Sequence, residues 1–145
     1  MGCYTGLSQA SSTMSKSGNS LEIYKGQSES LEIAIVRDEE DPNCKCKPGE
    51  TPQDLTGAVV YMTVRARIGD PEVLIQKTSA NILEIQINAP PTDGIVTVYL
   101  NPEDTSLLNA QIYYFDVWVK LSGGKRYPVI EPSEFVVKEP LTVIP

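Results

Sequence analysis

The pattern of apolar and polar residues changes at Leu21. From this point apolar residues alternate with polar ones, first at Leu21 and Ile23 and then at Leu31, Ile33 and Ile35. A period of two places alternate side chains on the same face of a strand. The two runs therefore predict two short strands, joined by a turn at residues 25–28.

Similar alternation continues along the rest of the chain. It covers residues 58–67, 73–77, 82–87, 95–100, 113–121, 126–130 and 135–138, separated by turns rich in Gly, Pro and Asn. Residues 101–105 are typical of one helical turn, with Asn101 as its cap and Pro102 in its first position. Strands at about ten-residue spacing without a long amphipathic helix favour an all-β antiparallel sandwich.

Residues 1–20 differ from this pattern. Ser, Gly, Thr and Asn dominate them, with Leu7 and Met14 as scattered large apolar side chains. Such a composition buries too little apolar area to offset the entropy cost of ordering the chain. We expect an extended N-terminal arm over residues 1–20, reaching about 66–72 Å when fully extended, and one sandwich domain over residues 21–145.

The net charge of −7 and the acidic run at residues 38–41 argue against nucleic acid as a partner, because no basic stripe is present to neutralise phosphates. We interpret the run as a solvated loop; calcium is the alternative, although the spacing of an EF-hand loop is missing. The longest apolar run is too short to span a bilayer, and the N-terminus does not resemble a secretory signal. We expect no membrane partner and synthesis in a cytoplasm.

The chain contains no histidine, which excludes Ser-His-Asp and Cys-His catalysis and the usual imidazole ligands of zinc. Glu103 and Asp104 are neighbours on a capped turn, where carboxylates more often stabilise the start of a helix. Residues 122–125 are typical of a hairpin turn and not of a phosphate-binding loop. We therefore expect no catalytic, cofactor-binding or metal-binding residues, and no cofactor.

Three cysteines, Cys3, Cys44 and Cys46, are an unusual feature. They can be free thiols, a disulfide formed after release from the cell, or part of a metal site. A bridge between Cys44 and Cys46 would close a very small, tense ring, so Cys3 is the better partner for either.

Several turn and strand signatures carry a family resemblance over residues 21–142. They are Gly26-Gln27-Ser28 before a strand, Asp54-Leu55-Thr56-Gly57-Ala58 before the next, residues 101–108, Tyr113-Tyr114-Phe115-Asp116-Val117, Gly124, and a closing valine-rich strand. In this order they resemble the immunoglobulin-like modules of tailed-bacteriophage structural proteins, and are similar to the N-terminal modules of phage baseplate upper proteins.

The residues of these signatures also have physical roles. Gly57 suits a tight turn into a strand, and Leu55 can close the end of a sandwich. Tyr113 follows Leu108 at a spacing that suits a tyrosine corner. Asp116 can face outward or cap a turn.

The resemblance implies an immunoglobulin-like fold and a non-enzymatic structural role in a virion. The expected location is the neck, tail, baseplate or fibre attachment, with several symmetric copies and other virion proteins as partners. Docking would use the arm, through Leu7 and Met14, and the sandwich surface. Two alternatives are a capsid decoration or cement protein and a free-standing module that binds host-surface carbohydrate through Tyr4, Tyr24, Trp118 and Tyr127.

Overall fold

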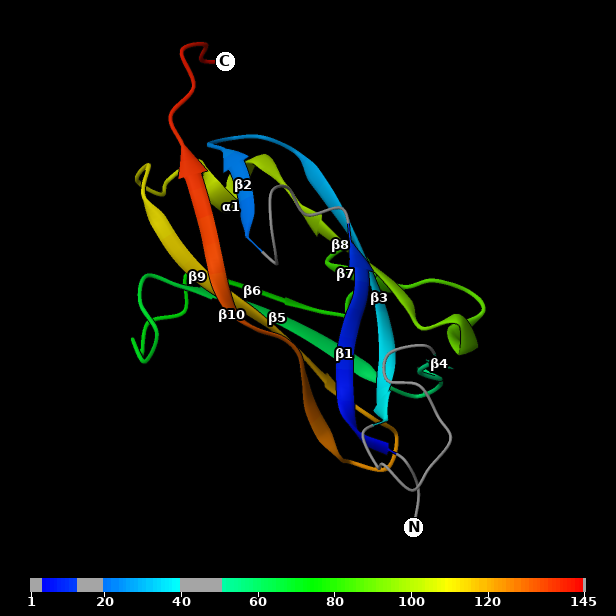
Figure 1. The fold of residues 1–145 in the computed structure, drawn as a ribbon. Coiled ribbons are helices and arrows are strands. Elements are labelled where there is room, and N and C mark those ends of the chain that lie inside the picture. The colour runs from blue at the N-terminus through cyan, green and yellow to red at the C-terminus, as the bar shows by residue number, and fades with distance from the viewer. Residues whose placement is uncertain (1–3, 13–19, 40–50, 145) are drawn as a thin grey trace.

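The computed structural model describes residues 4–12, 20–39 and 51–144, with residues 4–12, 38 and 39 described by their backbone (Figure 1). Cys3, Cys44, Cys46 and Met14 lie outside the described residues, as do the side chains of Leu7 and of the acidic run at 38–41. The expectations for thiols, a disulfide, calcium and arm side chains therefore stay predictions.

The described chain forms two sheets that pack face to face around one core (Figure 1). Every strand pair is antiparallel except β2 with β10. The first sheet has the order β1 (Tyr4–Ser12), β3 (Glu29–Glu39), β8 (Ile95–Leu100), β7 (Ile85–Ile87), and β4 (Thr51–Pro52) also pairs with β3. The second has the order β2 (Leu21–Tyr24), β10 (Arg126–Lys138), β9 (Ile112–Lys120), β5 (Val59–Arg65), β6 (Ile75–Thr78).

This strand order is that of an immunoglobulin-like sandwich, whose sheets contain strands A-B-E-D and G-F-C, the second extended by C′ in variable-type domains. Strands β1, β3, β8 and β7 take the places A, B, E and D, and β10, β9, β5 and β6 take G, F, C and C′. Strand β2 adds a parallel strand beside β10, so β1 and β2 follow one another in the chain but lie in opposite sheets. The predicted all-β, immunoglobulin-like antiparallel sandwich is confirmed.

The core consists of the inward-facing half of the alternating residues. Every second residue is buried from Val60 to Val64 in β5 and from Tyr113 to Val119 in β9. Phe115 of β9 meets Phe135 of β10 edge to face, with ring centroids 6.1 Å apart. Complete burial of such a side chain contributes about 1.5–3 kcal/mol. The alternation that predicts the strands therefore also identifies the face that is buried.

The segment before β5 closes one end of the sandwich. Leu55 is buried, as expected, and Gly57 has a φ of +74°, where a Cβ would stand 3.0 Å from the Cβ of Ser122. Thr56 donates from its hydroxyl and its N–H to the Asp54 carboxylate, at 2.6 and 2.9 Å. These two bonds hold the pKa of Asp54 below its ordinary value, the hydroxyl bond having the larger effect.

A tyrosine corner stands at the start of β9. The Tyr113 hydroxyl donates to the carbonyl oxygen of Asn109 at 2.8 Å, and the ring is buried. Leu108 is half-buried against the core beside this corner. Burial is the main influence on the phenol and raises the pKa of Tyr113, against the opposing effect of the Asn109 bond. The predicted tyrosine corner is confirmed.

The short helix α1 (Pro102–Thr105) is tied to two neighbouring elements. Asn101 caps it in a capping box with Asp104, as the sequence indicates for the cap position. The Asp104 carboxylate also lies 2.7 Å from the Lys77 ammonium of β6, a side chain that is almost fully buried. The Thr105 hydroxyl oxygen accepts from the N–H of Gly26 at 3.0 Å, in the turn between β2 and β3. This polar network holds α1, β6 and the β2–β3 turn together at one end of the molecule.

Two predicted strands near the C-terminus form one. The sequence predicts separate strands at 126–130 and 135–138, whereas β10 runs without a break from Arg126 to Lys138. Its register against β9 shifts twice, between Pro128 and Ile130 and between Ile130 and Ser133. Bulges of this kind disturb the alternation of side chains while the strand stays paired, which explains why the pattern breaks there.

Part of the expected arm belongs to a sheet of the same chain. Residues Tyr4–Ser12 form β1, which pairs antiparallel with β3 over Ile33–Glu39 and carries two irregularities in register. A sheet edge presents free N–H and C=O groups that any extended backbone can satisfy. Small polar residues suffice for such a strand, and this is why a pattern based on apolar side chains does not reveal it. A short 3₁₀ turn, η1 (Pro91–Asp93), completes the elements of the described residues.

Candidate functional site

Two surfaces of the sandwich carry exposed side chains suited to binding. The first lies on the outer face of the second sheet, where β5 and β9 run side by side. Six outward-facing side chains form three cross-strand pairs there: Tyr61 with Trp118, Thr63 with Asp116, and Arg65 with Tyr114. We name this set the β5–β9 face.

Trp118 is the large ring of the β5–β9 face that is most open to solvent, with 40% of its surface exposed. Its indole Nε1 donates to Oδ2 of Asp116 at 3.1 Å. Pro128 of β10 lies opposite Trp118 on the side away from Tyr61. Trp118 therefore stands between two flat side chains, with its orientation held by a carboxylate on the same strand.

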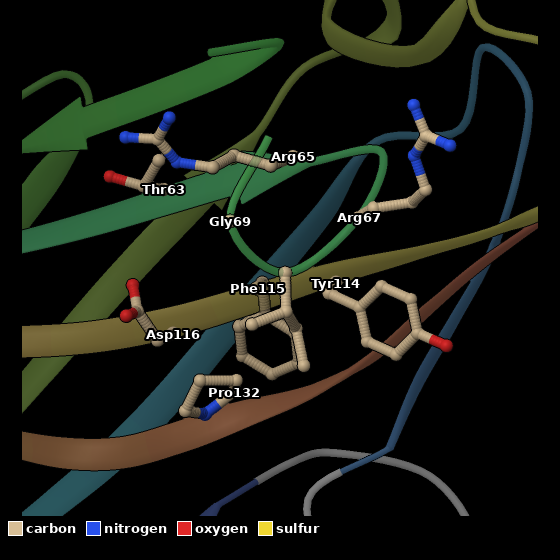
Figure 2. A pocket seen from close by; sticks show the side chains of 9 residues that line it. Thr63, Arg65, Arg67, Gly69, Tyr114, Phe115, Asp116 and Pro132 are labelled. Carbon is tan, nitrogen blue, oxygen red and sulfur yellow. The ribbon is translucent and has the colours of Figure 1, made fainter. Parts of the chain in front are cut away.

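A shallow hollow of about 130 Å³ lies on the same face, and Asp116, the hydrogen-bond partner of Trp118, is part of its lining. Its charged and hydroxyl-bearing lining includes Thr63 and Arg65 of β5, Asp116 of β9 and Arg67 of the loop after β5. Figure 2 shows Thr63 and Asp116 at one side of the hollow and the ring of Tyr114 at the other. One Arg65 nitrogen, Nη1, donates to the carbonyl oxygen of Asp70 at 2.6 Å, in the loop between β5 and β6. The hollow thus offers hydrogen-bond donors and acceptors beside an exposed aromatic ring.

The second surface lies at the α1 end of the molecule, where the chain leaves β10 and projects beyond the sandwich (Figure 1). Among its residues Leu141, Val143 and Ile144 are 104%, 85% and 86% exposed, and Leu107 beside α1 is 94% exposed. Of these, Val143 and Ile144 line an open hollow of about 950 Å³ together with Tyr24, the β2–β3 turn, Pro102, Ser106, Glu139, Pro140 and Thr142. We name Tyr24, Leu107, Leu141, Val143 and Ile144 the end surface.

Charged groups rim the end surface. The Lys25 ammonium lies 3.4 Å from the Glu139 carboxylate. The Lys138 ammonium lies 4.8 Å from the centre of the Tyr24 ring and 2.8 Å from Oε1 of Glu22. The hydrogen bond that the Lys138 ammonium donates to the Glu22 carboxylate is the main cause that raises the pKa of Lys138. Apolar side chains within a polar rim are the usual anatomy of a protein–protein interface.

The structure does not bring the four aromatic residues named from the sequence together. Tyr24 belongs to the end surface, Trp118 to the β5–β9 face, and Tyr127 is half-buried against the core. The side chain of Tyr4 lies outside the described part of the chain. Asp116 faces outward, which is one of the two roles that the sequence allowed for it; the other was to cap a turn.

Sequence reasoning missed the β5 half of the β5–β9 face. The alternation of β5 predicts that Tyr61, Thr63 and Arg65 share one face, but not which strand lies beside them. The neighbours follow only from the register of β5 against β9, which pairs residues about fifty or more positions apart. The exposed aliphatic residues after β10 do carry a sequence signal, since Leu141, Val143 and Ile144 follow the last alternating strand.

Among the described residues, no group of three or more His, Cys, Asp or Glu side chains is arranged to hold a metal ion. In the same residues, no helix has the length and apolar character needed to cross a bilayer.

The chain matches no protein-family model and no curated protein. Among solved structures it is similar to CopC from Methylosinus trichosporium OB3b, at 8% identity and a TM-score of 0.48, covering 95% of this chain and 99% of that one. It is also similar to murine CRIg, at 15% identity and a TM-score of 0.37, covering 90% and 98%. At these identities the likeness concerns the fold alone.

Proposed function

We propose that this chain is a non-catalytic structural subunit of a tailed-bacteriophage particle, and that neighbouring virion proteins cover its end surface. The observation that carries the proposal is the exposure of Leu107, Leu141, Val143 and Ile144 at one end of the sandwich. Val143 and Ile144 line one hollow with Tyr24, and exposed apolar side chains with a polar rim commonly mark a protein interaction site. Burying them against a partner gains about 25 cal/mol for each Å² of apolar area.

The positions of the two terminal segments support a role within an assembly. The paired part of β1 begins beside Glu39, at the far end of β3 from the β2–β3 turn, whereas residues 139–144 leave at the α1 end (Figure 1). If one end of a copy docked on the opposite end of the next, the contact would be heterologous, and such contacts generate rings or stacks of copies. A subunit of this shape therefore suits a neck, tail, baseplate or fibre-attachment layer better than an isolated dimer.

The family resemblance is the reason for proposing a tailed-bacteriophage particle. The signatures at Leu55, Gly57, Leu108 and Tyr113 resemble those of tailed-phage structural modules, and in this fold they build the closed end and the tyrosine corner of the sandwich. The lack of histidine in the chain supports a role without acid–base catalysis by imidazole. We propose other virion proteins as partners, synthesis in the host cytoplasm and final residence in the virion.

The proposal is tested by proteomics of purified particles. Particles from cells that express the chain with its phage are purified by density gradient, and peptides of the chain are quantified against the major capsid protein. We expect a fixed ratio across the gradient peak, with cross-links from Lys25 or Lys138 to tail or baseplate proteins. Cross-links to the capsid shell alone would support the decoration alternative, and peptides confined to the soluble fraction would contradict a virion role.

A further inference from the structure

The β5–β9 face presents chemistry that protein docking at the end surface does not use. Trp118 stands opposite Tyr61 and Pro128 of the two adjacent strands, and its indole N–H donates to the Asp116 carboxylate. Planar aromatic side chains offer a large, rigid apolar surface at a low cost in conformational entropy. A ligand that stacks on this ring must have an apolar face of its own.

The polar lining of the hollow near Asp116 favours a ligand that also has polar groups. Asp116 accepts hydrogen bonds, Arg65 donates them, and the Thr63 hydroxyl does both. An apolar side chain placed over these groups would remove their water without replacing the hydrogen bonds, which costs about 1–3 kcal/mol for each group. The ligand therefore carries hydroxyl-like groups that both donate and accept.

The volume of the hollow and the charge of the protein further limit the class of ligand. A hollow of about 130 Å³ is smaller than the roughly 300–1,000 Å³ of pockets that enclose drug-sized ligands. An extended ligand lying along the sheet, with one group inserted in the hollow, suits this shape. Arg65 and Arg67 of the lining both contact Asp70, and the net charge of −7 repels polyanions.

From these features we infer that the β5–β9 face binds a neutral, extended saccharide, with one sugar ring stacked on Trp118 and hydroxyl groups of the saccharide bonded to Asp116, Arg65 and Thr63. The apolar face of one ring meets the indole, and hydroxyl groups of the neighbouring ring replace the water of the hollow. The inference does not depend on the proposed virion role, because it uses a different surface and a different class of ligand.

The chain has one tryptophan and seven tyrosines, so fluorescence excited at the long-wavelength edge, where tyrosine hardly absorbs, reports on Trp118 alone. Purified full-length protein is titrated with neutral hexasaccharides: β-1,4-linked glucose, β-1,4-linked N-acetylglucosamine and α-1,4-linked glucose, with a galacturonic acid hexamer as the anionic comparator. We expect a saturable shift of the emission with at least one neutral hexamer, at a Kd of about 1 mM or tighter, and none with the anionic one.

Variants then locate the site, with binding followed by saturation-transfer NMR signals of the saccharide. Trp118→Ala should weaken binding at least about tenfold, and Trp118→Phe less, because a smaller ring remains. Asp116→Asn keeps an acceptor for the indole N–H and should weaken binding a few-fold. Tyr24→Ala removes an aromatic ring of similar exposure on the end surface and should leave binding unchanged. Thermal melts close to that of the unmodified protein show that these exposed substitutions preserve the fold.

Three outcomes would overturn the inference. They are no saturable response to any neutral hexamer at about 10 mM, equal weakening by Tyr24→Ala and Trp118→Ala, and tighter binding of the anionic hexamer. If Trp118→Ala abolished incorporation into particles while no hexamer bound, the face would be a protein-docking surface. Failure of the virion role would leave the fluorescence result intact, so the two proposals fail separately.

Discussion

Gly94 occupies a position where a side chain meets backbone on two sides. Its φ is +70°, and a Cβ would stand 2.6 Å from the carbonyl oxygen of Ile35 and 2.9 Å from that of Gln53. Neither oxygen lies at the end of a flexible side chain, and the Gly94 carbonyl accepts from the Ile35 N–H at 2.7 Å. The residue fastens the η1 turn to β3 through close backbone contact.

We expect Gly94→Ala to lower the free energy of unfolding by about 2–4 kcal/mol, since it adds a clash to an unfavourable φ. The matched control is Gly26→Ala, at φ +77° with no atom within 4 Å of the added Cβ. The control should lose about 1–2 kcal/mol, from the left-handed conformation alone. Chemical denaturation measures both variants, and equal losses would show that the close approach at Gly94 contributes nothing.

Tyr113 gives a pH-dependent test. Tyr113→Phe removes the hydrogen bond to Asn109, so we expect a loss of about 1–2 kcal/mol at neutral pH. Burial raises the pKa of Tyr113 in the folded state, so the folded protein holds the phenol proton more tightly than the unfolded chain. The stability that this adds is complete below the unfolded pKa of about 10 and is lost as pH rises through the folded value.

Unfolding curves of both proteins between neutral pH and pH 11 check this expectation. The stability advantage of the unmodified protein over Tyr113→Phe should narrow once the pH passes about 10. An advantage that stays constant or widens would contradict a buried neutral phenol at the corner.

At the scale of elements, the Lys77–Asp104 ion pair determines how α1 is held. The two charged groups are 2.7 Å apart, and their side chains are 6% and 16% exposed. Replacing one partner leaves the other charge poorly solvated, a loss of about 3–5 kcal/mol for a fully buried pair. Partial exposure of Asp104 reduces this, so we expect Lys77→Met to cost about 2–3 kcal/mol.

The control for the ion pair is a double-mutant cycle with Asp104→Asn, which keeps an acceptor for the N–H of Asn101. A double variant less destabilised than the sum of the two single variants would demonstrate the coupling. Additive losses would mean that the pair does not fasten α1 to β6.

Strand β1 allows a test of where the arm binds. The composition of residues 1–20 predicts that their removal leaves the isolated domain unaffected, whereas the β1–β3 ladder predicts a loss. Each backbone hydrogen bond contributes about 0.5–1.5 kcal/mol. We therefore expect deletion of residues 1–12 to lower the melting temperature by several degrees, at about 2–4 °C for each kcal/mol.

The deleted protein should also self-associate, since the edge of β3 would be uncovered. Sedimentation velocity measures this. An unchanged melting temperature and an unchanged monomer would indicate that β1 pairs with β3 only weakly in the isolated chain, and would favour pairing with a neighbouring subunit.

A comparison of the predicted strands with the observed ones shows which features the sequence predicts. Alternation located β2, β3, β5, β8 and β9, because each has one buried and one exposed face. It did not reveal β1, which is held by backbone groups, or the continuity of β10, which depends on bulges. Local motifs predicted the Asn101 cap and the Tyr113 corner. The β5–β9 face was not predictable, since it depends on a register between distant strands.

At the scale of the whole molecule, the fold separates three roles. The core and the tyrosine corner stabilise the sandwich, the β5–β9 face presents a polar and aromatic surface, and the end surface presents aliphatic side chains beyond the sandwich. The exposed aliphatic residues contribute little to the isolated fold. We therefore expect substitutions of these aliphatic residues to weaken the proposed docking without changing stability.

Incorporation of end-surface variants into particles tests the central claim most directly. Leu141, Val143 and Ile144 are changed together to Ser, with Ile68→Ser/Val73→Ser in the β5–β6 loop as a control that also removes exposed apolar side chains. Both variants should melt close to the unmodified protein, because surface substitutions change stability by about 0.5 kcal/mol or less. The account predicts that the control enters particles at normal occupancy and that the triple variant stays in the soluble fraction. Normal occupancy of the triple variant would contradict docking through the end surface.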